Sequence, residues 1–249
     1  MIMSRMVLIT GGAGGIGLAA ARRFVAEGSR VVLVDLDGRA LERARSTLVG
    51  DGGRVDIVEC DVAGHAAVQA AARGVLDRCG VVEVLVNNAG ISQPKGVLEL
   101  EEAEWERTLA INLKGAFNWC RALLPAMLEA GRGKIVNVAS MSAKMGGGPG
   151  TISRACYAAS KAGLLGFTRG LAREVAPAVT VNAVCPGLID TSMTRAFIAR
   201  AGDEIAAGIP LGRLGTPDDV AGVIQFLASP AAAWITGEVV DCNGGTYID

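Results

Sequence analysis

Tyr157 and Lys161 are the residues of this sequence whose types and spacing point most directly to chemistry. If the segment around them is helical, positions four apart lie on one face, so the phenol and the ammonium project side by side. A tyrosine titrates near ~10, and a neighbouring cation favours the phenolate and lowers that pKa. The pair therefore predicts an acid–base device, although a packed tyrosine beside a solvated lysine is the commoner reason for this spacing.

Few other side chains could carry acid–base chemistry near neutral pH. The sequence contains one histidine, His65, and two tyrosines, Tyr157 and Tyr247. His65 stands at the start of an expected helix, far in sequence from Tyr157, and we assign it no catalytic role. The six cysteines show neither a Cys-x-x-Cys pair nor the Cys/His spacing of a metal site, so we expect free thiols and no metal.

A glycine-rich turn near the start of the chain has the composition of a phosphate-binding loop. Residues 11–17 read Gly-Gly-Ala-Gly-Gly-Ile-Gly between an expected strand and an expected helix, whose N-terminus supplies free N–H groups. Asp35 follows after about 20 residues, where an acid binds a ribose 2′-hydroxyl. Its carboxylate would repel a 2′-phosphate and Gly14 offers no cation for one, which favours NAD(H) over NADP(H). The alternative is that Asp35 only caps the next helix.

The elements that must position these residues alternate between short β-branched runs and longer segments of helical period. Strands are expected at 6–10, 30–35, 54–60, 82–87, 134–140, 179–185 and 238–241, and helices at 15–27, 38–50, 65–79, 101–130, 154–176 and 216–228. This order implies right-handed crossovers and a parallel sheet covered on both faces. We expect an α/β protein with a three-layer Rossmann fold, a doubly wound parallel sheet of about seven strands, in a single domain over residues 1–249.

Composition agrees with such a fold and excludes several functional classes. Of the 249 residues, 51% are hydrophobic but only 4% aromatic, so the core must be built mainly from Val, Leu, Ile and Ala. The formal charge is −1 and there is no basic run, so we expect no nucleic acid partner. No apolar stretch approaches the ~20 residues that span a bilayer, and no signal peptide precedes the first strand. We therefore expect a cytoplasmic protein without membrane contact.

Together these segments resemble the short-chain dehydrogenase/reductase family over nearly the whole chain, and most of all its bacterial 3-oxoacyl-carrier-protein reductase branch. The matching motifs are the loop at 10–17, Asp61-Val62, Asn87-Asn88-Ala89-Gly90, Asn112 within 111–115, Ser140, Tyr157 with Lys161, Pro186-Gly187, and the stretch from Gly212 to Gly245. Any one of these motifs could arise by chance, whereas the ordered set is specific.

The resemblance implies a role for each matching residue. Tyr157 would exchange a proton with the substrate oxygen that Ser140 holds, and Lys161 would lower the Tyr157 pKa and bind the nicotinamide ribose. Asn112 would complete the catalytic tetrad by anchoring a water that links Lys161 to solvent. The implied cofactor site consists of Gly11, Gly14, Gly15, Ile16, Gly17, Asp35, Asp61, Val62, Asn88, Ala89, Gly90, Tyr157, Lys161, Pro186, Gly187, Ile189 and Thr191.

Two features depart from the branch. Asp35 and Gly14 differ from its NADP-dependent reductases, which argues against a biosynthetic reductase role. The segment between Ser140 and Tyr157 is a few residues longer than usual and contains a Gly-Gly-Gly-Pro-Gly run at 146–150. This run is either a tolerated surface insertion or a gate beside the substrate.

The expected function is NAD(H)-dependent interconversion of a secondary alcohol and a ketone. A 3-oxoacyl or 3-hydroxyacyl thioester is one expected substrate; a small secondary alcohol, a polyol, a sugar or a steroid-like alcohol is another. The alternative from a different class is a non-catalytic dinucleotide-binding sensor, against which the complete tetrad argues. Segment 188–211 would cover the substrate. The resemblance also implies a homotetramer with the helices 101–130 and 154–176 at its interfaces.

Overall fold

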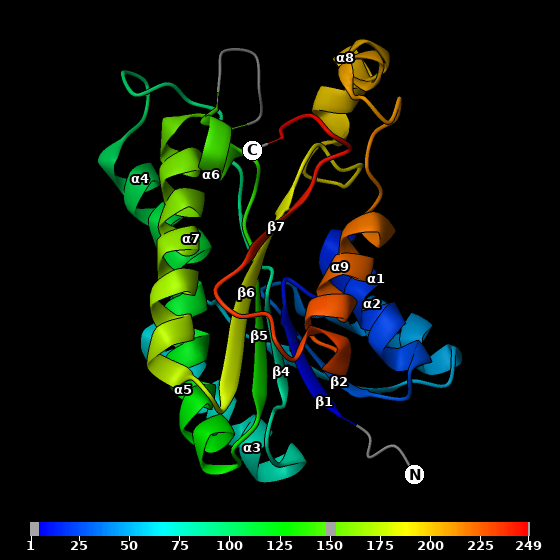
Figure 1. Cartoon of the computed structure of the whole chain (residues 1–249), viewed down its shortest axis with the longest axis vertical. Coiled ribbons are helices and arrows are strands. Elements are labelled where there is room, and N and C mark those ends of the chain that lie inside the picture. Colours follow the sequence, from blue (N-terminus) through cyan, green and yellow to red (C-terminus); the bar gives the residue numbers. More distant parts are fainter. Residues whose placement is uncertain (1–4, 148–152, 249) are drawn as a thin grey trace.

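The centre of the structure, a computed structural model that describes residues 5–147 and 153–248, is a parallel sheet (Figure 1). Its seven strands are β1 (Met6–Thr10), β2 (Arg30–Asp35), β3 (Arg54–Glu59), β4 (Val84–Asn87), β5 (Gly133–Val138), β6 (Val179–Pro186) and β7 (Val239–Cys242). They lie in the order β3-β2-β1-β4-β5-β6-β7. The strand order reverses between β1 and β4, and in such sheets ligands bind beyond the carboxyl ends of the strands at that point.

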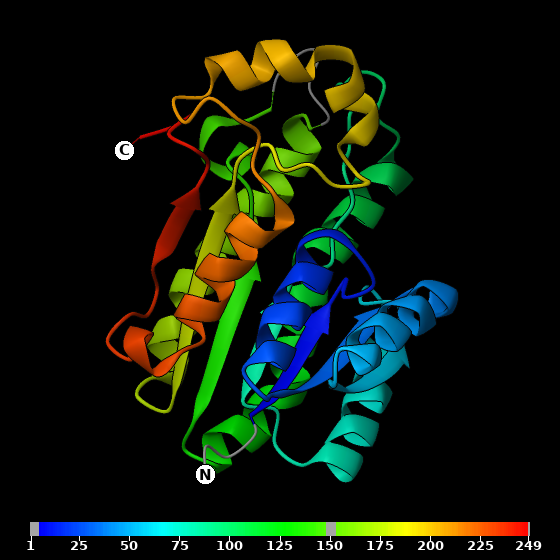
Figure 2. The same ribbon diagram turned by 90° about the vertical axis from the view of Figure 1, so that its right-hand side faces the viewer.

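Helices cover both faces of the sheet (Figure 1). One face carries α1 (Gly15–Ala26), α2 (Gly38–Gly50) and α9 (Pro217–Leu227), and the other carries α3 (His65–Cys79), α5 (Gly115–Glu129) and α7 (Ala155–Val175), with α4 (Glu102–Leu109) beside α7. The short α6 (Ser142–Met145) and α8 (Arg195–Gly208) lie beyond the carboxyl ends of the strands (Figure 2), and a short 3-10 turn spans Pro230–Ala232.

The core is divided by the sheet into two apolar layers. All five residues of β1 are buried, and they alternate between the layers: Val7 and Ile9 pack with Phe24 of α1, whereas Leu8 packs with Trp119 of α5. A strand covered on both faces is apolar over most of its length, which explains the run from Met6 to Ile9. The parallel register then brings the ends of neighbouring strands to one edge of the sheet.

The predicted fold class is confirmed, and the seven predicted strands agree with the observed ones to within two residues at each end. One predicted helix differs. The segment 101–130 is not a single α-helix, because a π-helical turn, η1 (Ala110–Lys114), separates α4 from α5. Such a turn holds one extra residue and redirects the side chains around it. Here it surrounds the buried Asn112.

Helix α8 was not among the predicted helices. Half-buried residues that include Phe197, Ile198 and Ile205 form an apolar stripe along it, but no residue of the helix is fully buried. Its backbone leaves helical geometry at Ala201, next to Gly202, and this kink interrupts the helical pattern.

Candidate active site

Three of the four predicted catalytic residues gather around the end of β5. Ser140 follows this strand by two residues, and Tyr157 and Lys161 project from α7. The Nζ of Lys161 lies 5.9 Å from the centre of the Tyr157 ring and donates a hydrogen bond of 2.8 Å to the carbonyl oxygen of Val138. The buried lysine therefore ties α7 to the last residue of β5.

Asn112 completes this group through its side-chain amide. Its Oδ1 accepts from the N–H of Ile91 at 2.8 Å, and its Nδ2 donates to the carbonyl of Ile91 at 3.0 Å and to Oγ of Ser160 at 3.0 Å. Ser160 in turn donates to the carbonyl of Tyr157 at 2.7 Å. Both Asn112 hydrogens are thus committed, and one lone pair of Oδ1 is left to hold the predicted water.

Gly90, one of the predicted cofactor residues, lies next to Asn112 and Lys161. A Cβ at Gly90 would lie 3.3 Å from Oδ1 of Asn112 and 3.4 Å from Nζ of Lys161. Close approach to both catalytic side chains accounts for glycine at this position, since any larger residue would crowd them.

The pKa of Tyr157 differs in direction from the sequence-based expectation. Burial raises the pKa of the Tyr157 phenol above its usual value, and a hydrogen bond from Ser140 opposes this only in part. Burial also lowers the pKa of Lys161 to about 8. Burial thus outweighs the other effects on the phenol, and the prediction that Lys161, together with the oxidised nicotinamide, lowers the Tyr157 pKa stays a prediction. At pH 7 the phenol is neutral and is kept as a proton donor, whereas Lys161, with a pKa of about 8, is still mostly protonated.

Lys161→Met should change how stability depends on pH. The folded-state pKa of Lys161, about 8, lies below the ordinary 10.5, so the unfolded chain binds more protons between these values. Stability then rises with pH across this window, by about 3 kcal/mol. We expect the wild-type free energy of unfolding to rise by this amount relative to Lys161→Met, measured by urea unfolding from pH 7 to 10.5. A constant difference between the two proteins would contradict the prediction.

The loop after β1 is locked against the loop after β4. Nδ2 of Asn88 donates to the carbonyls of Thr10 and Gly11, each at 3.0 Å, and Oγ1 of Thr10 accepts from the N–H groups of Asn88 and Ala89. A Cβ at Gly11, where φ is +62°, would lie 2.9 Å from Cα of Ala89. A Cβ at Gly17 would lie 2.2 Å from the Gly11 carbonyl oxygen. The structure thus brings these predicted cofactor residues together.

The N-terminus of α1 fits the pyrophosphate of a dinucleotide. Gly14 is the N-cap, no side chain caps the helix, and its first turn has no acidic residue. No atom lies within 4 Å of a Cβ position at Gly14, and Thr191 approaches that of Gly15 at 3.5 Å. Uncapped N–H groups and the helix dipole therefore face an open space bordered by the loop after β6. Ile16, the remaining predicted residue of this loop, is half-buried in the first turn.

Asp35 is fixed against the same loop. Its Oδ2 accepts from the N–H of Ala13 at 3.2 Å, and its Oδ1 accepts from the N–H of Leu36 at 2.8 Å. The N-cap of α2 is Asp37, whose side chain accepts from the N–H of Ala40. The alternative that Asp35 caps this helix is therefore wrong, and its carboxylate lies at the edge of the dinucleotide loop.

Asp61 and Val62 follow β3 on the same edge of the sheet. Burial alone would raise the pKa of Asp61, but the N–H of Ala63 at 3.0 Å and the guanidinium of Arg107 at 2.9 Å together lower it. Asp61 is therefore charged and half-buried, and Val62 is buried against Gly115 at the start of α5.

The segment after β6 borders a cavity of about 400 Å³. The N–H of Gly187 donates to the carbonyl of Cys242 at 2.9 Å, and the carbonyl of Pro186 accepts from Met141 at 3.0 Å. Gly187 and Ile189 line the cavity together with residues of β7, but Ser140 and Tyr157 do not. The cavity is therefore a neighbour of the catalytic group rather than its centre.

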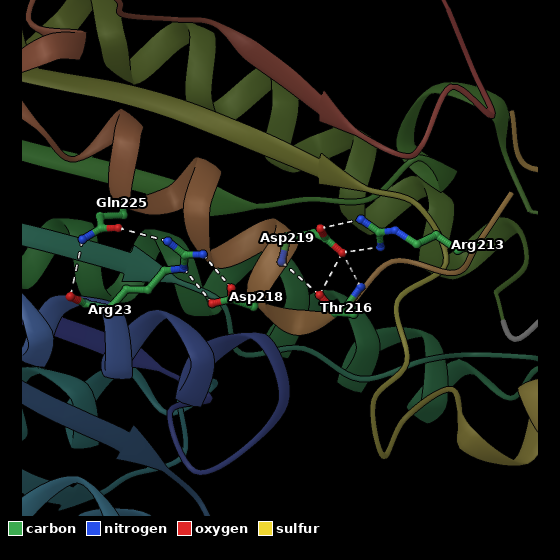
Figure 3. Close-up of polar contacts among 6 residues, drawn as sticks. All are labelled: Arg23, Arg213, Thr216, Asp218, Asp219 and Gln225. Atoms are coloured by element: carbon green, nitrogen blue, oxygen red, sulfur yellow. Dashed lines mark hydrogen bonds and ion pairs between the residues drawn. The ribbon is translucent and has the colours of Figure 1, made fainter. Parts of the chain in front are cut away.

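The predicted cover segment, 188–211, is anchored at both ends. Near its start, the N–H of Asp190 donates to the carbonyl of Gly215 at 2.9 Å, and at its end the N–H of Leu211 donates to the carbonyl of Gly244 at 3.1 Å. Just beyond its far end, Arg213 forms two hydrogen bonds to Asp219, at 2.7 and 2.8 Å, and Asp219 accepts from Thr216 at the N-terminus of α9 (Figure 3). These contacts fix the ends of the cover, whereas α8 between them has no buried residue.

The same helix N-terminus is bound to α1 by a second arginine. Arg23 forms hydrogen bonds of 2.7 and 2.6 Å to Asp218 and also contacts Gln225 (Figure 3). The N-terminus of α9, which follows the cover segment, is thus bound to α1, the helix that follows the glycine-rich loop.

The remaining predicted features lie apart from the tetrad or outside the described residues. His65 lies within 3.0 Å of Oδ1 of Asn118 and stacks on Phe117 of α5. In the described part of the chain the six cysteines are free, no three potential ligands gather as a metal site, and no helix could cross a membrane. Of the glycine run at 146–150, only Gly146 and Gly147 lie within the described residues.

Comparisons with known proteins define the class of this chain. A family model described as enoyl-(acyl carrier protein) reductase matches residues 11–247. The chain belongs to the short-chain dehydrogenase/reductase family of oxidoreductases, close to its 3-oxoacyl-[acyl-carrier-protein] reductase branch.

Individual relatives match over almost the whole chain. The 3-oxoacyl-[acyl-carrier-protein] reductase FabG of Vibrio cholerae is 38% identical and covers 98% of both chains. A short-chain dehydrogenase/reductase from Brucella melitensis has a TM-score of 0.91 at 38% identity, covering 98% of this chain and 97% of its own. A variant of actinorhodin polyketide ketoreductase with NADPH has a TM-score of 0.91 at 36% identity, again covering 98% and 97%.

Two residues that hold the site together were not among the predicted site residues. Thr10 caps the loop after β4, and Ser160 links Asn112 to the backbone of Tyr157. A small hydroxyl residue between Tyr157 and Lys161 was a visible signal for Ser160, but its partner comes from a turn 48 residues away.

Proposed function

We propose that this chain is an NAD(H)-dependent oxidoreductase that interconverts a secondary alcohol and a ketone by hydride transfer. The observation that supports this most is the Tyr157 phenol beside the buried Lys161 ammonium, with Ser140 hydrogen-bonded to the phenol and Gly90 of the cofactor side in contact. A nucleotide sensor has no need of an acid and an oxygen-binding hydroxyl at this place.

The proposed mechanism assigns one task to each side chain. In reduction, Tyr157 donates its proton to the substrate oxygen, which Ser140 holds by hydrogen bonding. Oγ of Ser140 already accepts from the N–H of Ser142 at 3.1 Å, which aims its own hydrogen toward the substrate. When bound, the dinucleotide supplies or accepts the hydride, and the charge of its oxidised ring favours the phenolate during alcohol oxidation.

Lys161 and Asn112 support this proton exchange. The ammonium has three hydrogens, of which Val138 takes one, so two can bind the hydroxyls of the nicotinamide ribose. The free lone pair of Asn112 would hold a water next to Lys161, through which protons reach solvent. The Gly11–Gly17 loop, Asp35, Asp61 and the segment from Pro186 to Thr191 would hold the rest of the dinucleotide.

The cofactor preference is carried by Asp35. Its carboxylate borders the dinucleotide loop, where it can accept hydrogen bonds from a ribose 2′-hydroxyl and repel a 2′-phosphate. The solved ketoreductase relative holds NADPH, so the preference needs a direct test.

Asp35→Ala should narrow the preference for NAD(H) over NADP(H) by roughly 5–30-fold, since a repulsion of ~1–2 kcal/mol disappears. The measurement is kcat/KM for both cofactors in both proteins. Asp37→Ala, which alters the cap of α2, serves as the matched control. An unchanged ratio in Asp35→Ala would show that this acid does not select the cofactor.

The experiment that tests the function as a whole is a panel of ketones and alcohols followed at the NADH absorbance, with NADP(H) in parallel. The panel should include 3-oxoacyl and 3-hydroxyacyl thioesters, because a curated relative is a 3-oxoacyl reductase. Small secondary alcohols, polyols, sugars and a steroid alcohol form the second arm. Turnover of no member with either cofactor would overturn the proposal. We further propose a cytoplasmic, single-domain protein that assembles as a homotetramer.

A further inference from the structure

Arg154 is a half-buried arginine that, among the described residues, has no acidic partner. Its Nε is buried and makes no hydrogen bond. Other arginines of the chain each pair with an aspartate within 2.9 Å, namely Arg23, Arg30, Arg107 and Arg213. Leaving a guanidinium N–H buried without an acceptor is costly, so the position calls for an explanation.

The place of Arg154 in the fold supplies one. It is the N-cap of α7, one helical turn before Tyr157, and its N–H donates to the carbonyl of the buried Gln93 at 3.1 Å. Its neighbour Ser153 hydrogen-bonds through Oγ to Oγ of Ser142 at 2.9 Å, and Ser142 is two residues beyond Ser140. Arg154 therefore stands where the segments that carry both substrate-binding hydroxyls meet.

The guanidinium lies along the loop after β4. A Cβ at Gly96 would come within 2.9 Å of Nη1 of Arg154, so glycine makes room for the side chain there. Lys95, the neighbouring cation on this loop, is already paired with Glu104 at 2.7 Å. The carboxylate of Glu99 lies near the same glycine, 3.6 Å from that Cβ position, and accepts from the N–H of Gly96 at 3.0 Å. Among the described residues, however, no carboxylate forms an ion pair with Arg154.

We infer that Arg154 binds an anionic group of the substrate, a carboxylate or a phosphate, and so selects anionic ketones. The inference rests on the proposed function, because it takes the substrate carbonyl to lie between Ser140 and Tyr157. A guanidinium presents its N–H groups as a planar fork that matches two oxygens of such an anion, and the accessible part of this half-buried side chain can present them. Neutral sugars, polyols and steroid alcohols would leave this charge unpaired.

The test compares each anionic ketone with a neutral partner in which the anionic group is esterified or absent. The anionic probes are 3-oxobutanoate, 4-oxopentanoate and dihydroxyacetone phosphate; the neutral probes are the two methyl esters and dihydroxyacetone. We expect the wild type to prefer at least one anion over its neutral partner by about tenfold or more in kcat/KM. Arg154→Gln should lower kcat/KM for that anion by roughly 10–100-fold, mainly through KM, because a charged hydrogen bond is lost. The carboxylate and phosphate arms show which anion is bound.

Four controls make the result specific. Arg154→Lys should retain part of the preference, and Arg169→Gln, an exposed arginine of the same helix, should leave it unchanged. The neutral ketones should change by no more than about twofold in Arg154→Gln, because one charge-assisted contact is absent from their complexes. The thermal unfolding temperature of Arg154→Gln without ligand should not be lower than that of the wild type. The substitution removes a buried donor without a partner and breaks no existing hydrogen bond of that donor.

The inference would be overturned if the wild type showed no preference for any anion. It would also be overturned if Arg154→Gln lowered kcat/KM equally for charged and neutral ketones. Calorimetric titration of Tyr157→Phe, which retains Arg154 but lacks the proton donor, separates binding from turnover. If no ketone is turned over but an anion binds about tenfold more tightly to Tyr157→Phe than to the Tyr157→Phe/Arg154→Gln double variant, the proposed function fails and the inference stands. If neither turnover nor this difference is seen, both fail.

Discussion

Tyr157→Phe should abolish turnover, with kcat/KM lowered by about 10³-fold or more, because it removes the group that exchanges a proton with the substrate oxygen. The ring remains, so the packing against Lys161 is kept and the affinity for NADH should change by less than about twofold, within the ordinary effect of a conservative swap. Initial rates at the NADH absorbance measure the first quantity, and a fluorescence titration with NADH measures the second.

Tyr247→Phe is the matched control, because Tyr247 is the other tyrosine of the chain and lies beside Lys144 rather than Lys161. It should retain nearly full activity. Residual activity in Tyr157→Phe comparable to that of Tyr247→Phe would remove Tyr157 from the proposed role. It would mean that another group exchanges the proton with the substrate oxygen.

Gly17→Ala should destabilise the protein by about 1–3 kcal/mol, and lower the affinity for NADH, because overpacking forces the backbone to shift. A Cβ at Gly17 would stand 2.2 Å from the Gly11 carbonyl oxygen, which belongs to the dinucleotide loop itself. Helix propensity alone predicts the opposite sign, a gain of about 0.5–1 kcal/mol for alanine inside a helix. Urea unfolding without cofactor therefore separates the two effects.

Gly14→Ala is the control for this prediction. Its φ of −166° is ordinary extended backbone, and no atom lies within 4 Å of its Cβ position. Its free energy of unfolding should change by less than about 0.5 kcal/mol, as for an open surface position. Equal effects of the two substitutions would show that the contact with Gly11 does not decide stability.

Much of this architecture could be predicted from local patterns. Buried parallel strands are apolar throughout, and the polar residues that follow them, such as Asn88 and Ser140, must then gather at one edge of the sheet. The glycines of the first turn and Asp35 at the end of β2 could be found for the same reason, because their function depends on the backbone immediately around them.

The parts that could not be predicted depend on contacts between distant segments. The π-helical turn around Asn112 is held by Ile91 and by Ser160 of α7, neither of which is a neighbour in sequence. The lowered pKa of Lys161 follows from burial, which no spacing of residues reveals. The missing partner of Arg154 is likewise visible only when every neighbouring segment is in place.

The anchoring of the cover segment has a consequence for how this protein can diverge. Asp190 at one end and Leu211 at the other donate to backbone carbonyls outside the segment, and no residue of α8 between them is fully buried. Substitutions at exposed positions usually change the free energy of unfolding by less than about 0.5 kcal/mol. The exposed positions of α8, such as Arg195, Arg200 and Glu204, can therefore vary while the stability of the sheet stays the same.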